Sequence, residues 1–96
     1  MLLVVTYDVN VTHPSGQKRI RQVAKLCEKY GMRVQNSVFE VLVDAAQLTL
    51  LKHELGKVID PSLDSIRFYR LGNTYQNKIA TMGKTASIQA GEPLIL

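Results

Sequence analysis

The residues that most constrain the fold are 2–7, an apolar stretch that predicts a β-strand with hydrophobic side chains on both faces. Successive side chains of a strand point to opposite sides, so Leu3 and Val5 share one face while Leu2 and Val4 share the other. Exposing either row of apolar side chains to water is unfavourable. The fold must therefore cover both sides of the sheet that contains this strand.

Two amphipathic helices are expected further along the chain. In the first, residues 16–30, apolar side chains recur at helical spacing, with Ser15 as the N-cap and Gly31 as the stop signal. The second, residues 45–59, begins at a capping box whose first residue is Asp44. Each helix thus has one apolar face that can pack against a sheet.

Three more strands complete the pattern. Residues 32–43 are rich in valine and are interrupted at 35–37, which predicts two short strands joined by a tight turn or a bulge. Residues 65–71 alternate between apolar and polar side chains and form the fourth strand. The order β-α-β-β-α-β predicts an α+β, ferredoxin-like fold, in which both helices lie on one face of a four-stranded antiparallel sheet.

The whole chain, residues 1–96, is expected to form a single domain. Residues 1–72 make its ferredoxin-like core. Residues 73–96 are a C-terminal extension with an extra short strand at 78–82 and an apolar end at 93–96 that docks on another surface.

Two helices cover only one face of such a sheet, and the opposite face is apolar as well. It carries Val4 from the first strand, Val38 and Leu42 from the third, and Tyr69 and Leu71 from the fourth. A bare apolar face of this kind is larger than soluble monomers usually tolerate. A second copy is the simplest cover, so we expect a symmetric homodimer in which the C-terminal extension adds to the partner's sheet edge.

Composition excludes several classes of protein. Cys27 is the one cysteine, which rules out an intrachain disulfide and a multi-cysteine metal site. No apolar run approaches the roughly 20 residues of a membrane helix, so no membrane partner is expected and the default location is cytoplasmic. The net charge of +4 and the pI of about 9.4 favour a polyanionic partner such as a nucleic acid.

Asp8 ends the first strand on the face assigned to the dimer partner, and two interpretations of it stay open. As a structural residue, Asp8 begins or caps the following turn. As a functional residue, it is a metal ligand, because two carboxylates brought together by a twofold axis, with several retained waters, suit Mg²⁺ or Mn²⁺. Such an ion activates water and stabilises charge on a phosphodiester.

The first helix carries a row of cations opposite its apolar face. This basic stripe consists of Lys18, Arg21, Lys25 and Lys29. These residues are three or four positions apart, and Glu28 is the only acidic residue on the helix. Such a face is usually only solvated, but it also fits a nucleic-acid backbone. Arg19 lies beside the stripe, where it reaches a phosphate near Asp8 or packs its stem.

Other polar residues lie close to the predicted hairpin. They are Arg33, Gln35, Asn36 and Ser37. They suit contact with sugar and phosphate, and they are also ordinary residues for a turn or a sheet edge. His13, in the loop after Asp8, is a candidate general base.

Four segments in this order resemble one known family. They are residues 5–9 (VTYDV), 18–21 (KRIR), 30–40 (YGMRVQNSVFE) and 64–72 (DSIRFYRLG). Nearly the whole chain is similar to CRISPR-associated protein two, the small protein of CRISPR adaptation. Residues in the tail, at 83–84, 87–88 and 93–95, resemble the type one, subtype C branch.

The resemblance implies a ferredoxin-like homodimer in antiviral defence and, in some members, a metal-dependent endonuclease activity on single-stranded RNA or double-stranded DNA. Asp8 matches the family's strand-end aspartate, its catalytic metal ligand. The family's helix arginine matches Arg19 or Arg21, and its post-helix arginine matches Arg33. Its Ser-Val-Phe segment begins here at Ser37, which is expected to contact the nucleic acid.

The family also implies a second role, so two hypotheses remain. In the first, the chain is a Mg²⁺-dependent hydrolase of phosphodiester bonds that uses Asp8 from both copies. In the second, Lys18, Arg21 and Lys25 hold duplex protospacer DNA, and the dimer bridges the CRISPR integrase as a scaffold without chemistry of its own.

Overall fold

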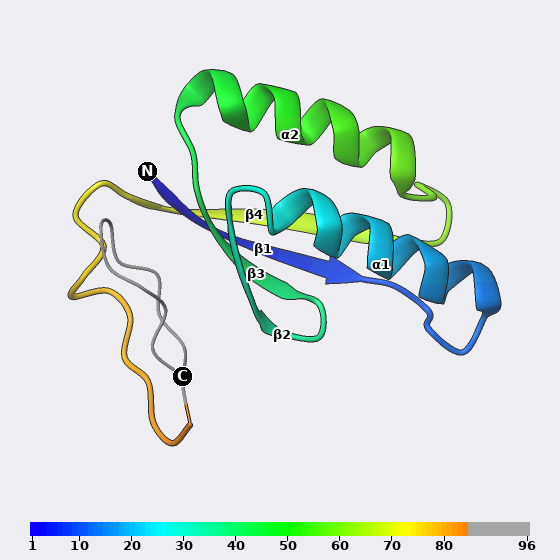
Figure 1. Cartoon of the computed structure of the whole chain (residues 1–96), viewed down its shortest axis with the longest axis horizontal. Coiled ribbons are helices and arrows are strands. Elements are labelled where there is room, and N and C mark those ends of the chain that lie inside the picture. Colours follow the sequence, from blue (N-terminus) through cyan, green and yellow to red (C-terminus); the bar gives the residue numbers. More distant parts are fainter. Residues whose placement is uncertain (85–96) are drawn as a thin grey trace.

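The computed structural model describes residues 1–84 and shows a four-stranded sheet with two helices on one face (Figure 1). The elements are β1 (Leu2–Asp8), α1 (Pro14–Cys27), β2 (Gly31–Gln35), β3 (Val38–Leu42), α2 (Ala45–Val58) and β4 (Ser65–Gly72). The strand order is β2-β3-β1-β4, and each neighbouring pair is antiparallel. The predicted ferredoxin-like α+β fold is confirmed.

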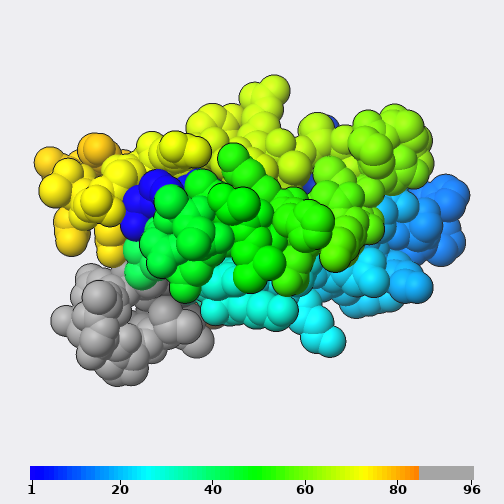
Figure 2. Space-filling model, turned by 90° about the horizontal axis from the view of Figure 1, so that it is seen from above, coloured from blue at the N-terminus to red at the C-terminus, as the bar shows by residue number. Residues whose placement is uncertain are grey.

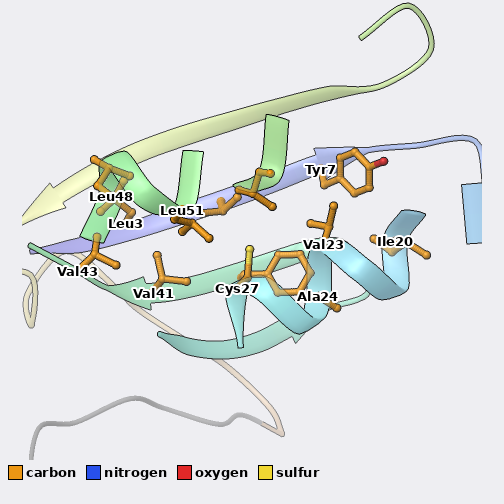
Figure 3. Packing of buried hydrophobic residues seen from close by; sticks show 13 residues of the cluster. Leu3, Tyr7, Ile20, Val23, Ala24, Cys27, Val41, Val43, Leu48 and Leu51 are labelled. Atoms are coloured by element: carbon orange, nitrogen blue, oxygen red, sulfur yellow. The ribbon is translucent and has the colours of Figure 1, made fainter. Parts of the chain in front are cut away.

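The hydrophobic core lies between the sheet and the two helices (Figure 3). Its fully buried members include Leu3 and Val5 of β1, Phe39 and Val41 of β3, Val23 and Cys27 of α1, and Leu51 and Leu55 of α2. Burying one such aliphatic or aromatic side chain stabilises the fold by about 1.5–3 kcal/mol. The strand residues in this core are those that the alternation of the sequence assigned to the helix-covered face.

The start of α1 differs from the prediction. Its first residue is Pro14, which suits this position because no helical hydrogen bond needs its missing N–H. The N-cap is His13, whose Nδ1 accepts a hydrogen bond from the Ser15 N–H at 3.3 Å. The prediction of Ser15 as the cap is therefore wrong, because the imidazole of His13 takes that role two residues earlier.

The end of α1 differs as well. The helix stops at Cys27, and Gly31 is the first residue of β2 instead of the helix stop signal. A Cβ atom at Gly31 would lie 1.8 Å from the carbonyl oxygen of Glu40. The glycine is thus needed for close backbone approach between β2 and β3.

The capping box of α2 forms as predicted. The Gln47 N–H donates to Asp44 Oδ1 at 2.7 Å, and the Asp44 N–H donates to Gln47 Oε1 at 2.9 Å. These two bonds satisfy backbone donors at the start of the helix.

The sheet face opposite the helices carries the expected apolar side chains. Val4 lies in register with Glu40 of β3 and with Tyr69 of β4, and Tyr69 is 47% exposed. Both helices of residues 1–84 lie on the other side of the sheet (Figure 1). The homodimer that would cover this face stays a prediction.

Residues 73–84 leave β4 at the end of the molecule away from the start of α1 (Figures 1 and 2). The predicted strand at 78–82 does not form. The Lys78 N–H donates to the Tyr75 carbonyl at 2.9 Å within a turn, and residues 79–82 are irregular. A strand needs a neighbour to bond its backbone, and in one chain this stretch pairs with no strand. The prediction for the apolar end at 93–96 lies outside the described residues.

Across residues 1–84, neither helix has the length and hydropathy that a membrane span requires.

Candidate nucleic-acid interface and metal site

The end of β1 opens into a cleft of about 620 Å³, which we call the Asp8 cleft. It is bordered by β1 and the loop that follows it, by α1, and by β2 with the turn that leads to β3. Its lining residues are Thr6, Tyr7, Asp8, Val9, Val11, Gln17, Ile20, Arg21, Arg33, Asn36 and Ser37. The fold therefore gathers Asp8, Arg21, Arg33 and Ser37, four of the seven site residues that the sequence singled out.

The turn between β2 and β3 reaches the end of β1 through a backbone hydrogen bond. The Tyr7 N–H donates to the Ser37 carbonyl oxygen at 2.9 Å. This bond places Ser37 beside Asp8, the next residue of β1. The strand pairing between β2 and β3 shifts register between Arg33 and Gln35, an irregularity of the kind that redirects side chains near functional sites.

Two contacts orient Arg33 on the wall of the Asp8 cleft. Its Nε donates to the Asn36 carbonyl oxygen at 2.8 Å, and its guanidinium carbon lies 5.8 Å from the centroid of the Phe39 ring, within the range of a cation–π interaction. In the described part of the chain, its two terminal nitrogens make no hydrogen bond. Arg33 is thus held in place by its Nε and its stacking, and its two terminal nitrogens are of the kind that could bind a phosphate.

A second hollow of about 700 Å³, which we call the basic groove, runs along α1. Its lining residues are Lys18, Arg21, Gln22, Ala24, Lys25, Glu28, Lys29 and Arg33. All four residues of the basic stripe border it. Because Arg21 and Arg33 line both hollows, the basic groove and the Asp8 cleft meet at these two arginines.

Arg19 borders neither hollow. Its Nε and Nη2 donate to Asp64 at 2.8 and 3.2 Å, its Nη1 donates to Ser15 Oγ at 2.9 Å, and its side chain is only 12% exposed. The guanidinium is therefore engaged by a buried carboxylate. The structure thus places Arg19 against Asp64 and Arg21 on the wall of the cleft. Contact between Arg19 and nucleic acid stays a prediction.

The carboxylate of Asp64 is a functional candidate that the sequence did not single out. It is buried, and it also accepts hydrogen bonds from the Tyr7 hydroxyl and from the Asp60 N–H at 3.0 Å. Burial by itself raises the pKa of Asp64, but the hydrogen bonds from Arg19 and Tyr7 outweigh burial and lower the pKa. Asp64 is therefore ionised at neutral pH.

Tyr7 is the second side chain that binds Asp64. Its side chain is on the core-facing side of β1 and is 2% exposed, and a buried tyrosine hydroxyl needs a hydrogen-bond partner. Burial, followed by the hydrogen bond to Asp64, raises the pKa of Tyr7 to about 12. The hydroxyl is protonated at neutral pH and donates to the carboxylate. A tyrosine on the core-facing side of the first strand is the signal that could have revealed the network, although it does not identify the acceptor.

The residues at the cleft fit a hard, partly hydrated cation. Asp8 is exposed and is the one acidic residue of the lining, where Ser37 and Asn36 add a hydroxyl and an amide oxygen. Oxygen donors of these kinds suit Mg²⁺ or Mn²⁺ with several retained waters. In residues 1–84, no three His, Cys, Asp or Glu side chains gather as a closed metal cage. One chain thus offers an open site with a single carboxylate.

Known proteins resemble this chain over most of its length. A family model described as CRISPR associated protein Cas2 matches residues 1–79. The CRISPR-associated endonuclease Cas2 of Halalkalibacterium halodurans is 54% identical over 95 residues, which cover 99% of both chains. The CRISPR-associated endoribonuclease Cas2 3 of Rhodospirillum rubrum is 50% identical over 95 residues, 99% of this chain and 100% of that one.

Solved structures agree with these relatives. The crystal structure of Streptococcus pyogenes Cas2 at pH 6.5 matches with a TM-score of 0.81 and 54% identity, over 86% of this chain and 100% of that one. A hypothetical protein from Thermus thermophilus matches with a TM-score of 0.70 and 29% identity, over 88% and 92%. The assignment to the subtype C branch stays a prediction. On the family match and these identities, the chain belongs to the CRISPR-associated protein Cas2 family.

Proposed function

We propose that this protein is a metal-dependent endonuclease of CRISPR adaptation that hydrolyses phosphodiester bonds at the Asp8 cleft. One observation carries the proposal: the single carboxylate of the cleft shares its walls with Arg21 and Arg33, the arginines at which the basic groove begins. The names of the relatives, an endonuclease in H. halodurans and an endoribonuclease in R. rubrum, support this class of reaction.

In this proposal, the basic residues bind the nucleic acid and Asp8 binds the metal ion. Lys18 and Lys25 in the basic groove neutralise phosphates along the strand. Arg33, already oriented by Asn36 and Phe39, uses its terminal nitrogens to hold a phosphate next to Asp8. Asp8 holds Mg²⁺ or Mn²⁺, with Ser37 as a neighbouring oxygen donor. When bound, the ion supplies activation of water and neutralisation of the developing charge on the phosphate.

The second candidate role is that of a scaffold, favoured by the sparse donor set of the cleft. Asp8 is the one acidic residue in the lining of the Asp8 cleft. A metal ion held by a single carboxylate is bound weakly, so hydrolysis by one chain is expected to be slow. Three residues of the basic stripe, Lys18, Arg21 and Lys25, lie on α1, and Lys29 lies in the turn that follows it. A symmetric homodimer doubles this stripe on the helix side of the sheet. In this role the protein binds duplex DNA through Lys18, Arg21 and Lys25 and bridges the CRISPR integrase.

The Asp8→Asn variant separates the two roles. Matched RNA and duplex DNA are incubated with the purified protein and Mg²⁺, Mn²⁺ or a chelator, and binding is measured on the same substrates. An endonuclease loses cleavage in D8N and keeps binding, because the variant removes a metal ligand and leaves the basic groove intact. The Glu28→Gln control removes the same charge from the border of the basic groove and keeps cleavage.

Two outcomes would count against the endonuclease hypothesis. Cleavage by D8N at the wild-type rate would refute the metal assignment. If the wild-type protein binds duplex DNA but cleaves neither substrate with either ion, the endonuclease hypothesis is refuted and the scaffold role remains.

A further inference from the structure

Asp64 joins three separate parts of the fold. It lies at the end of the connection between α2 and β4, where its N–H donates to the Asp60 carbonyl at 2.7 Å and its Oδ2 accepts from the Asp60 N–H. Its side chain is fully buried and also receives the Tyr7 hydroxyl of β1 and the guanidinium of Arg19 in α1. One carboxylate thus links β1, α1 and the connection before β4.

One of these donors, Tyr7, lines the Asp8 cleft, and the other, Arg19, lies two residues before a lining residue. Tyr7 directly precedes Asp8, and Arg19 lies in the same part of α1 as the lining residue Arg21. Figure 3 shows the Tyr7 hydroxyl directed away from the apolar cluster. The end of β1 is therefore held on one side by the Tyr7–Asp64 bond and on the other by the backbone bond to Ser37.

The loop that follows Asp8 is also tied to the start of α1. A Cβ atom at Gly16 would lie 1.9 Å from the Asn10 carbonyl oxygen, so the loop and the first turn of the helix are in close backbone contact. Ser15 Oγ lies 2.7 Å from His13 Nδ1 and accepts from Arg19. A shift of Arg19 would therefore be passed to the loop as well as to the helix.

Apolar packing alone does not explain this arrangement. A buried carboxylate is costly unless every partner is in place, and a hydrophobic group of similar size would often stabilise a core equally well. Hydrogen bonds add direction, so a fully satisfied network defines one orientation of the elements it joins. Here those elements carry Asp8 and Arg21.

We propose that Asp64 and Arg19 are positioning residues of the Asp8 cleft, which hold the end of β1, and with it Asp8, in fixed relation to Arg21 and Arg33. Neither residue lines the cleft, and both act through Tyr7 and α1. The catalytic consequence rests on the proposed endonuclease function. The structural consequence, a fixed end of β1, does not.

The first test compares Asp64→Asn with Val23→Ala. D64N keeps the shape of the side chain and removes its charge, whereas V23A weakens the α1 core away from the network. At a temperature where both variants are folded, D64N lowers the kcat of cleavage by about tenfold with KM nearly unchanged, because misplaced catalytic groups slow the chemical step. V23A leaves both constants near those of the wild type. Equal kcat values in the two variants would refute the proposal.

The second test needs no activity. Amide hydrogen exchange is measured at Tyr7, whose N–H donates to Ser37, in the wild type, D64N and V23A. Relative to the loss of global stability in each variant, the Tyr7 amide loses more protection in D64N than in V23A. The same loss in both would overturn the proposal. A wild type that cleaves nothing would refute the endonuclease function, while the exchange result would still decide the positioning role.

Two milder variants apply if D64N does not fold. Tyr7→Phe removes only the hydroxyl donor, and Arg19→Lys keeps the charge but loses the two-pronged contact with Asp64. Both are expected to lower kcat and Tyr7 protection in the same direction by smaller factors. Wild-type behaviour of both variants in both measurements would refute the proposal.

Discussion

Arg21 of α1 and Arg33 of β2 face the same two hollows, although they belong to different elements on either side of the groove. Their shared position makes the basic groove continuous with the cleft that contains Asp8. Under the proposed function, a strand of nucleic acid bound along α1 would be led toward the carboxylate. The proposed binding surface and the proposed site of chemistry are thus joined at Arg21 and Arg33.

The salt dependence of nucleic-acid binding tests the basic groove. In the Lys18→Ala/Lys25→Ala double variant, the slope of log K against log salt for duplex DNA is expected to fall by about 2, because each lost phosphate contact removes about one unit. Fluorescence anisotropy titrations at several salt concentrations measure the slope. The control, Lys52→Ala/Lys57→Ala on α2, removes the same charge from outside the groove and should keep the wild-type slope. Equal slopes in the two double variants would contradict the assignment.

The geometry of Arg33 is tested by a substitution that keeps its charge. Arg33→Lys loses the planar guanidinium that lies over Phe39 and the Nε bond to Asn36. A lysine presents a point charge instead of a fork, so cleavage efficiency is expected to fall by about tenfold. Steady-state kinetics on the better of the RNA and DNA substrates provide the measurement. Arg70→Lys, on exposed β4, is the control, and an equal effect of both would argue against a special role for Arg33.

The predicted homodimer is tested on the sheet face opposite the helices. Tyr69, on that face, is 47% exposed, and Leu50, on α2, is 49% exposed. Tyr69→Glu places a charge in the expected interface and should shift the protein to monomer, because burying an unpaired charge is costly. Leu50→Glu should leave the dimer intact. Sedimentation or light scattering gives the masses, and a wild-type monomer at micromolar concentration would disprove the dimer.

The raised pKa of Tyr7 implies that the free energy of unfolding falls at alkaline pH. Its pKa is 10.0 in the unfolded chain and about 12 in the fold, so its contribution is complete below pH 10 and is lost as the pH rises toward 12. The shift corresponds to about 3 kcal/mol at most. Denaturant unfolding across this pH range should show a smaller loss for Tyr7→Phe than for the wild type. Burial raises the pKa of Cys27 to about 12 as well, so part of the loss should remain.

A second tyrosine, outside the Asp64 network, provides the control for the measurement of unfolding at alkaline pH. Tyr75→Phe changes a tyrosine outside the Asp64 network and should show the full wild-type loss. If Tyr7→Phe and Tyr75→Phe lose the same stability between pH 10 and 12, the bond between Tyr7 and Asp64 does not account for the effect.

Local patterns were sufficient to predict most of the fold. Alternation along the strands correctly placed Leu3, Val5 and Phe39 in the core, and side-chain chemistry correctly predicted the cap at Asp44. Both depend on contacts between near neighbours or on the burial of apolar surface. The same reasoning failed at residues 78–82, because strand formation depends on an available neighbour and not on the segment alone.

The prediction that Gly31 ends the first helix is wrong for a reason that lies far away in the sequence. A glycine after a helix commonly ends it, but here it is needed because the backbone of Glu40 passes close by. The need for glycine at position 31 arises from the pairing of β2 with β3. The sequence around Gly31 does not show how close the backbone of Glu40 will come.

The ferredoxin-like fold, the acidic end of β1 and the row of cations along the first helix can all be predicted from local patterns in the sequence. The different surroundings of Arg19 and Arg21 are visible only in the folded chain. The two arginines are two positions apart on one helix, and Arg19 turns to Asp64, a partner 45 residues away, while Arg21 borders the Asp8 cleft. A hydrogen bond over that separation depends on how the elements pack, which the chemistry of either residue alone does not specify.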